Sequence, residues 1–159
     1  MRSVTRGFGV LALLMWTGLA AAPAGAAVVH FTIPMDGAQE VPGPGDPDGF
    51  GLADLYIDDV ALTIDWNFDV SNITLPLTGA HIHAAPVGMA GSVVVDFSAM
   101  LSGSGLFDAD LAGVLAAPDQ YYVNLHNANF PAGAIRGQLP EPASLALLGL
   151  GALIVLRRR

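Results

Sequence analysis

The sequence predicts an all-β fold, an antiparallel β-sandwich that carries one short helical turn and is flanked by a hydrophobic helix at each end of the chain. Two observations favour the sandwich. Short runs rich in β-branched and aromatic residues recur at intervals of roughly ten residues, with Gly, Pro and Asp between them. One run, residues 61–70, alternates strictly between apolar and polar side chains, which is typical of a strand with one buried face.

The individual elements follow from the same signals. The alternating run puts five apolar side chains on its buried face: Leu62, Ile64, Trp66, Phe68 and Val70. The other strands are expected at residues 28–33, 51–58, 79–84, 92–97, 121–126 and 134–139. Residues 108–117 are expected to form one or two helical turns, with Asp108 as the N-cap and Pro118 beyond the end.

The connections carry the residues that turns need. Residues 36–50 form a loop rich in Gly, Pro and Asp, and Asp58-Asp59 makes a tight turn between two strands. Residues 130–133 are a further turn, and residues 102–105, Ser-Gly-Ser-Gly, are expected in a loop. Asp46-x-Asp48-Gly49 has the first residues of a calcium loop without its later ligands, so we interpret it as a turn.

Acidic residues dominate the predicted domain, residues 27–139. All six basic residues of the chain are arginines, and only Arg136 lies in the domain, against twelve Asp and one Glu, so its formal charge is 1 − 13 = −12. This balance excludes nucleic acid as a partner, because phosphate contacts need Lys and Arg. The chain has no cysteine, which excludes disulfides, thiolate metal sites and cysteine nucleophiles.

Residues 1–26 have the pattern of a secretory signal peptide. Arg2 and Arg6 supply the positive start, residues 8–22 supply the apolar core, and Ala24-Gly25-Ala26 is a small-x-small cleavage site for signal peptidase. The alternative is an uncleaved membrane anchor, although the apolar run is short and ends in small residues. We therefore expect an exported protein.

Residues 140–159 form a separate tail. Pro140-Glu141-Pro142 precedes an apolar run over residues 143–156, and Arg157-Arg158-Arg159 follows it. A helix of that length spans about 21 Å, which is less than the roughly 30 Å of a bilayer core, and the arginines would stay on the cytoplasmic side. This suits a transient hold in the inner membrane, and a weak C-terminal anchor is the alternative.

Three strand-borne histidines are the clearest candidate site. His81 and His83 are two residues apart, so in a strand both side chains point to the same face, about 6–7 Å apart at Cβ. His126 is a third ligand if its strand lies alongside, and neutral imidazole suits zinc or copper(II). The alternatives are histidines that serve the structure through hydrogen bonds, and calcium binding by clustered aspartates.

Arg136 is expected to form a structural ion pair with a carboxylate, and Glu40 is the candidate partner. A buried pair of this kind is costly to break, whereas an exposed pair contributes little. No nucleophile–base arrangement is evident, since the serines lack a Gly-x-Ser-x-Gly elbow. We therefore expect no catalytic residues.

The tail resembles the PEP-CTERM protein-sorting signal. Pro140-Glu141-Pro142, the short apolar helix and Arg157-Arg158-Arg159 match its three parts in order. The resemblance implies a Gram-negative bacterium that makes exopolysaccharide, and processing by an exosortase that leaves the protein at the cell surface or in the extracellular matrix. The partners it implies are exosortase beside signal peptidase, and exopolysaccharide or surface proteins as binding partners.

The body resembles the CHRD domain, first described in chordin. The matching segments occur in the family's order: residues 37–42 (GAQEVP), 79–83 (GAHIH), 91–94 (GSVV), 122–126 (YVNLH) and 130–139 (FPAGAIRGQL). The chain departs from the family pattern at Asn127, where Thr is usual, and at Ala134, where an acidic residue is common. The family is an extracellular β module without an agreed biochemical activity, so this resemblance implies a fold and a location but no reaction.

The Gly-x-His-x-His arrangement on a β-sandwich is also similar to copper/zinc superoxide dismutase, in which such a pair binds copper. The expected sandwich is therefore immunoglobulin-like or superoxide-dismutase-like. The zinc loop of that enzyme has no counterpart here, and only His30 remains as a fourth histidine. We expect a non-enzymatic surface or matrix module, and the alternative is a histidine-based copper or zinc protein with weak redox activity.

Overall fold

The computed structural model describes residues 26–141. The hydrophobic helices predicted at both ends lie outside these residues, as do Ala24 of the cleavage site and the tail from Pro142 to Arg159. The predictions made for those segments therefore stay predictions. Within residues 26–141, no helix has both the length and the apolar character that a membrane crossing requires.

The described chain is almost entirely β-structure, with one short α-helix and two 3-10 turns. The elements in chain order are β1 (Val28–Asp36), η1 (Gly37–Gln39), β2 (Phe50–Asp58), β3 (Thr63–Ser71), β4 (Leu77–Ala84), β5 (Ser92–Asp96), β6 (Ser102–Phe107), α1 (Leu111–Ala116), η2 (Pro118–Gln120), β7 (Tyr121–Asn127) and β8 (Ile135–Gln138).

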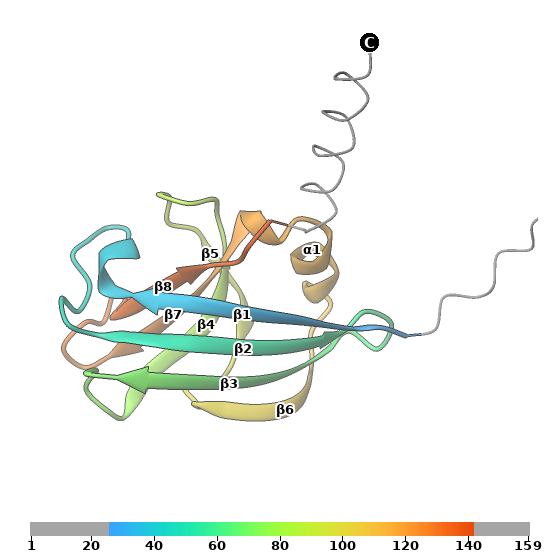
Figure 1. Ribbon diagram of the computed structural model, residues 1–159, viewed down its shortest axis with the longest axis horizontal. Coiled ribbons are helices and arrows are strands. Elements are labelled where there is room, and N and C mark those ends of the chain that lie inside the picture. Colours follow the sequence, from blue (N-terminus) through green and yellow to red (C-terminus); the bar gives the residue numbers. More distant parts are fainter. Residues whose placement is uncertain (1–25, 142–159) are drawn as a thin grey trace, which may run out of the picture.

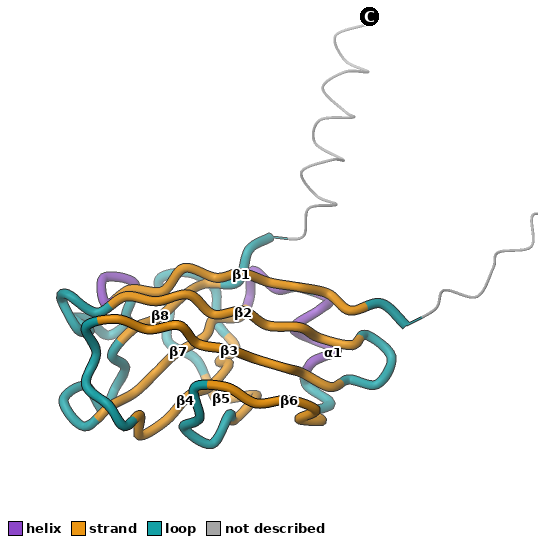
Figure 2. The backbone as a smooth tube through the Cα atoms, turned by 60° about the horizontal axis from the view of Figure 1, so that its bottom comes forward, coloured by secondary structure: helices purple, strands orange, loops and turns teal. Residues whose placement is uncertain are grey.

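The strands form one antiparallel sheet in the order β5-β4-β7-β8-β1-β2-β3-β6. Its two halves meet at the β8–β1 pair, where Asp36 opposite Arg136 is the single register pair. The sheet curls at this narrow seam, so that β4, β7 and β8 lie behind β1, β2 and β3 in Figure 1, and the turned view of Figure 2 shows the same two layers. The predicted all-β antiparallel fold is confirmed, with the two layers of the sandwich supplied by one continuous sheet.

The hydrophobic core fills the space between the two halves. Alternate residues of β3 face it, and the adjoining strands contribute Phe31, Ile33, Leu55, Ile57, Ile82, Val123, Leu125 and Ile135. Leu111 and Val114 of α1 are fully buried and close one end of the core. A buried aliphatic side chain contributes about 1.5–3 kcal/mol, so this core is the main source of stability in a domain without cysteines.

Two predicted boundaries are wrong by a few residues. Leu62, expected on the buried face of a strand, lies in the β2–β3 turn with a φ of 50°, because Asp58 Oδ1 accepts the backbone N–H groups of Val60 and Ala61 and extends the turn. Asp108 is not the N-cap of α1. Asp110 occupies that position, and the Asp108 carboxylate accepts the Asp110 N–H instead.

The loop predicted for residues 102–105 is wrong, because these residues begin strand β6, which pairs with β3. Glycine and serine have low β-propensity, so composition alone does not reveal this strand. The reason lies in packing: a Cβ at Gly103 would overlap the indole ring of Trp66. The strand therefore needs a glycine where its neighbour carries the largest side chain.

The outer face of the β4-β7-β8 half is covered rather than exposed. Both faces of β7 are buried, including Tyr122 and Asn124, which alternate with the core residues. Arg136 donates hydrogen bonds to backbone carbonyls in the β4–β5 loop, residues 85–91, and Asn124 donates one to Glu40 in the β1–β2 connection. Two loops thus lie over a buried layer of polar side chains, and the histidines stand in this layer.

A candidate three-histidine metal centre

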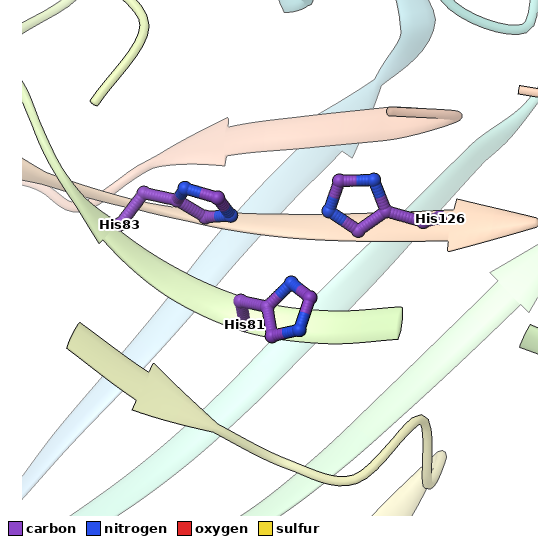
Figure 3. A group of neighbouring side chains, drawn as sticks. All are labelled: His81, His83 and His126. Carbon is purple, nitrogen blue, oxygen red and sulfur yellow. The ribbon is translucent and has the colours of Figure 1, made fainter. Parts of the chain in front are cut away.

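The structure brings His81, His83 and His126 together on the outer face of two paired strands. β4 carries His81 and His83, and β7 carries His126, with Gly79 opposite His126 and His81 opposite Asn124 in the register. Figure 3 shows the three rings turned toward a common space. One nitrogen of each ring lies within 4.8 Å of the corresponding nitrogens of the other two.

The spacing of the rings is close to that of a metal site. The ring centroid of His81 lies 5.4 Å from that of His83 and 5.1 Å from that of His126. The centroids of His83 and His126 are 6.0 Å apart. Tetrahedral zinc with Zn–N bonds of about 2.0–2.1 Å needs nitrogens about 3.4 Å apart. Small side-chain rotations that draw the rings in by roughly 1 Å would reach that geometry.

Hydrogen bonds on the far side of two rings determine which nitrogen faces the common space. His83 Nδ1 lies 3.0 Å from the carbonyl oxygen of Gly91, and His126 Nδ1 lies 3.1 Å from that of Pro131. A carbonyl oxygen can only accept, so each Nδ1 carries the proton and each Nε2 holds a free lone pair. Metal-binding histidines are oriented by outer contacts of this kind.

His81 has the opposite orientation, with an acidic residue as its outer neighbour. Its Nε2 lies 3.7 Å from Asp96 Oδ1, which favours the proton on Nε2 and leaves the lone pair on Nδ1. His81 Nδ1, His83 Nε2 and His126 Nε2 are all buried and have no hydrogen-bond partner among the described residues. Three lone pairs without donors therefore converge, and a metal cation would satisfy all three.

Burial keeps the three rings neutral. Desolvation is the main reason why the pKa of each histidine lies below its ordinary value. Asp96 raises the pKa of His81 in part, whereas the charge of Arg136 lowers the pKa of His83 further. Neutral imidazole is the form that binds metal, so the cluster is in its binding form at neutral pH.

Gly79 supplies the room for two of the rings. A Cβ at this position would lie 2.7 Å from His81 Cε1 and 3.2 Å from His126 Cδ2. The missing side chain leaves a gap in the outer face of β4 opposite His126, into which both rings extend.

Gly79→Ala is expected to weaken metal binding about tenfold or more without loss of folding, because the new methyl group displaces ligands but alanine is no worse than glycine in a strand. Zinc titration calorimetry on the wild type and the variant measures the affinity, and circular dichroism of the metal-free proteins checks the fold. Unchanged zinc affinity in folded Gly79→Ala would show that the rings do not need this gap.

The structure does not bring Glu40 and Arg136 into the predicted ion pair. Both side chains are buried, but no oxygen–nitrogen contact within 4 Å joins them among the described residues. Arg136 donates to Met89 O at 2.7 Å and Pro86 O at 3.3 Å, so its guanidinium is hydrogen-bonded to the β4–β5 loop. Their remaining interaction is electrostatic at longer range.

Glu40 is a buried carboxyl group with few partners. Asn124 Nδ2 donates to Glu40 Oε2 at 3.2 Å, and Glu40 Oε1 has no partner in the part of the chain that the structure describes. Desolvation raises the pKa of Glu40 to about 7, although the Asn124 hydrogen bond and the Arg136 charge oppose the shift. Glu40 is therefore partly protonated near neutral pH.

No carboxylate cluster accompanies the histidines in the described part of the chain. Within residues 26–141, His81, His83 and His126 are the one group of three or more His, Asp or Glu residues with ligand atoms close enough for a metal. Asp46 is buried, and burial with a hydrogen bond to Asp48 raises its pKa, which is unfavourable for a calcium ligand. His30 lies on the other half of the sheet, where its Nε2 is 2.9 Å from Asp54 Oδ1.

Sequence reasoning missed the residues that orient the ligands. Gly91 and Pro131 act through backbone carbonyls, which no side-chain pattern reveals. Tyr122 stacks on His83 with the ring centroids 4.9 Å apart. Tyr122 lies directly opposite His83 in the β4–β7 register. A sequence analysis could have found this contact only by predicting that register.

Comparison with known families agrees with this architecture. Residues 31–139, which make up more than half of the chain, match the family model of the CHRD domain, and residues 138–159 match that of the PEP-CTERM protein-sorting motif. No curated protein and no solved structure matches the chain. The sorting motif marks a protein that an exosortase processes and that is exported to the cell surface of a Gram-negative bacterium. With its all-β sandwich and the match over residues 31–139, the chain belongs to the CHRD domain family.

Proposed function

We propose that this exported domain binds one zinc or copper(II) ion through His81, His83 and His126. The observation that carries the proposal is the set of three buried, unpartnered nitrogens with free lone pairs that face one another. If the histidines served the structure alone, each would be expected to pair both nitrogens, because an unpaired buried polar atom costs about 1–3 kcal/mol. A bound metal removes that cost.

The ligand chemistry favours zinc and copper over calcium. Imidazole nitrogen is a ligand for zinc and copper(II), whereas calcium takes six to eight oxygen ligands. Three protein ligands leave one position for water in a four-coordinate zinc site. The proposal is a binding role at the cell surface or in the matrix, and it includes no catalytic step.

A structural role in the matrix is the second candidate function, and the exposed acidic face of β3 favours it. Asp65, Asn67 and Asp69 alternate with the core residues and point to solvent. A face of this charge attracts cations, through which it could associate with acidic exopolysaccharide or surface proteins. Both roles are compatible, because this face lies on the half of the sheet opposite to the histidines.

The metal content of the full chain tests the proposal. The protein is purified without a histidine tag in a mild detergent, and elemental mass spectrometry is expected to find one zinc or copper ion per chain, retained in excess calcium. A metal-free preparation is then titrated with zinc and with copper(II). A folded chain that contains neither metal and takes up neither on titration would overturn the proposal.

A further inference from the structure

Arg136 holds the β4–β5 loop, residues 85–91, against the outer face of the sheet. Its guanidinium donates to the carbonyl oxygens of Met89 and Pro86 and to Gln138 Oε1. Gln138 in turn donates to Ala85 O at 3.1 Å. Arg136 is only 2% exposed, so its guanidinium is shielded from solvent and relies on these contacts for hydrogen bonding.

Tyr122 links the arginine to the histidine cluster. The Arg136 guanidinium carbon lies 3.4 Å from the centroid of the Tyr122 ring, and the His83 ring stacks nearly parallel on the same residue, at an interplanar angle of 10°. The Tyr122 hydroxyl accepts the Gly91 N–H at 3.2 Å. Gly91 is the residue whose carbonyl oxygen binds His83 Nδ1.

These contacts form a continuous path from Arg136 to one ligand. We infer that Arg136 is a positioning residue of the metal centre: through the β4–β5 loop and Tyr122 it fixes the Gly91 carbonyl, which holds His83 with Nε2 toward the other two rings. The inference rests on the proposed metal site and deepens it, because it assigns the residue that sets the tautomer and orientation of a ligand.

The hydrogen bonds from the Arg136 guanidinium to the loop carbonyls act as a clamp on residues 85–91. The loop depends on this clamp because its own packing is weak. Val87 is 77% exposed and Met89 is 58% exposed, so the loop tip buries little apolar surface. Within the loop, the Met89 N–H to the Pro86 carbonyl is the one backbone hydrogen bond that the described structure contains. The contacts with Arg136, Gln138 and Tyr122 therefore position Gly91.

A purely electrostatic role for Arg136 predicts the opposite result. Its positive charge lowers the pKa of His83 and would repel a bound cation, so removal of the charge alone should strengthen metal binding. Loss of the clamp should weaken it. Arg136→Gln removes the charge and the clamp, whereas Arg136→Lys keeps the charge but loses the planar fork of donors and most of the ring stacking.

Zinc affinity of the full chain in mild detergent separates the two roles. Both Arg136→Gln and Arg136→Lys are expected to bind zinc about 10–100-fold more weakly than the wild type, the usual effect of losing an outer contact of a ligand. Tyr122→Phe is a smaller change that removes only the hydroxyl contact with Gly91, and it is also expected to weaken zinc binding. This variant keeps the test valid if the arginine variants do not fold. Asp54→Asn, on the other half of the sheet, is the control with unchanged affinity.

Hydrogen exchange of residues 86–91 in the metal-free proteins supplies a readout that is independent of metal, and both Arg136 variants are expected to exchange faster there than the wild type. Tighter zinc binding by Arg136→Gln, or equal binding by the wild type and every folded variant, would overturn the inference and leave the metal site standing. A wild-type chain that binds no zinc or copper would instead overturn the proposed function.

Discussion

Zinc is expected to stabilise the wild-type chain by about 4 kcal/mol when free zinc is a thousand times its Kd, and to stabilise His81→Ala and His126→Ala hardly at all. The gain arises because the three nitrogens meet only in the folded state, so the metal binds that state preferentially. Urea unfolding curves with and without zinc measure the difference for each protein.

His30→Ala is the matched control for these variants. His30 is the remaining histidine of the chain, and it lies on β1, in the other half of the sheet, with Asp54 and Tyr56 as its neighbours. Its substitution is expected to leave the zinc-dependent gain intact. Equal zinc stabilisation of His81→Ala and the wild type, or loss of the gain in His30→Ala, would show that zinc binds elsewhere.

The metal-free proteins provide a second comparison. In the absence of zinc, His126→Ala removes a buried nitrogen that has no partner, and this offsets part of the packing lost with the ring. The metal-free variant is therefore expected to differ from the wild type by about 2 kcal/mol or less. The large effect of the substitution should appear only when metal is present.

Strands of the fold could be predicted where apolar and polar side chains alternate along the sequence. Ile64, Trp66 and Phe68 alternate with polar residues, and the strand they predict is present with those residues buried. Strand β6 could not be predicted, because it contains Gly103, where a side chain would overlap the Trp66 ring of the neighbouring strand β3. Such a requirement is a tertiary contact, and local propensity does not report it.

The candidate site could be predicted only in part, for a related reason. The two-residue spacing of His81 and His83 places them on one face in any strand. The approach of His126 depends on the β4–β7 register, and the choice of nitrogen depends on the carbonyls of Gly91 and Pro131. Opposite charges predict a carboxylate partner for Arg136, but in the folded chain the arginine donates to the loop carbonyls instead.

Glu40→Gln is expected to change how stability depends on pH. The folded state raises the pKa of Glu40 from 4.5 to about 7, chiefly through desolvation. Between these values the folded chain holds a proton that the unfolded chain releases, so this residue lowers the unfolding free energy as pH rises from 4.5 through 7. The loss is roughly 2–3 kcal/mol above pH 7, with allowance for solvent screening.

The histidines contribute with the opposite sign, so the variant must be compared with the wild type at each pH. Because the pKa values of His81, His83 and His126 are lowered, their contribution to stability is present above pH 6.5 and is lost as pH falls through their folded pKa values. Both proteins share this contribution, and it cancels in the difference. Urea unfolding in the presence of a chelator, from pH 4 to pH 8, measures that difference.

The unfolding free energy of Glu40→Gln minus that of the wild type is expected to rise by roughly 2–3 kcal/mol across this range, because only the wild type must ionise a buried carboxyl group. Glu141→Gln, at the other and exposed glutamate of the chain, is the control for the substitution itself. A flat difference would mean that Glu40 ionises at its ordinary pKa in the folded protein. Pairing of Glu40 with Arg136 in solution would have that effect, and it would draw the arginine away from the loop that it is inferred to hold.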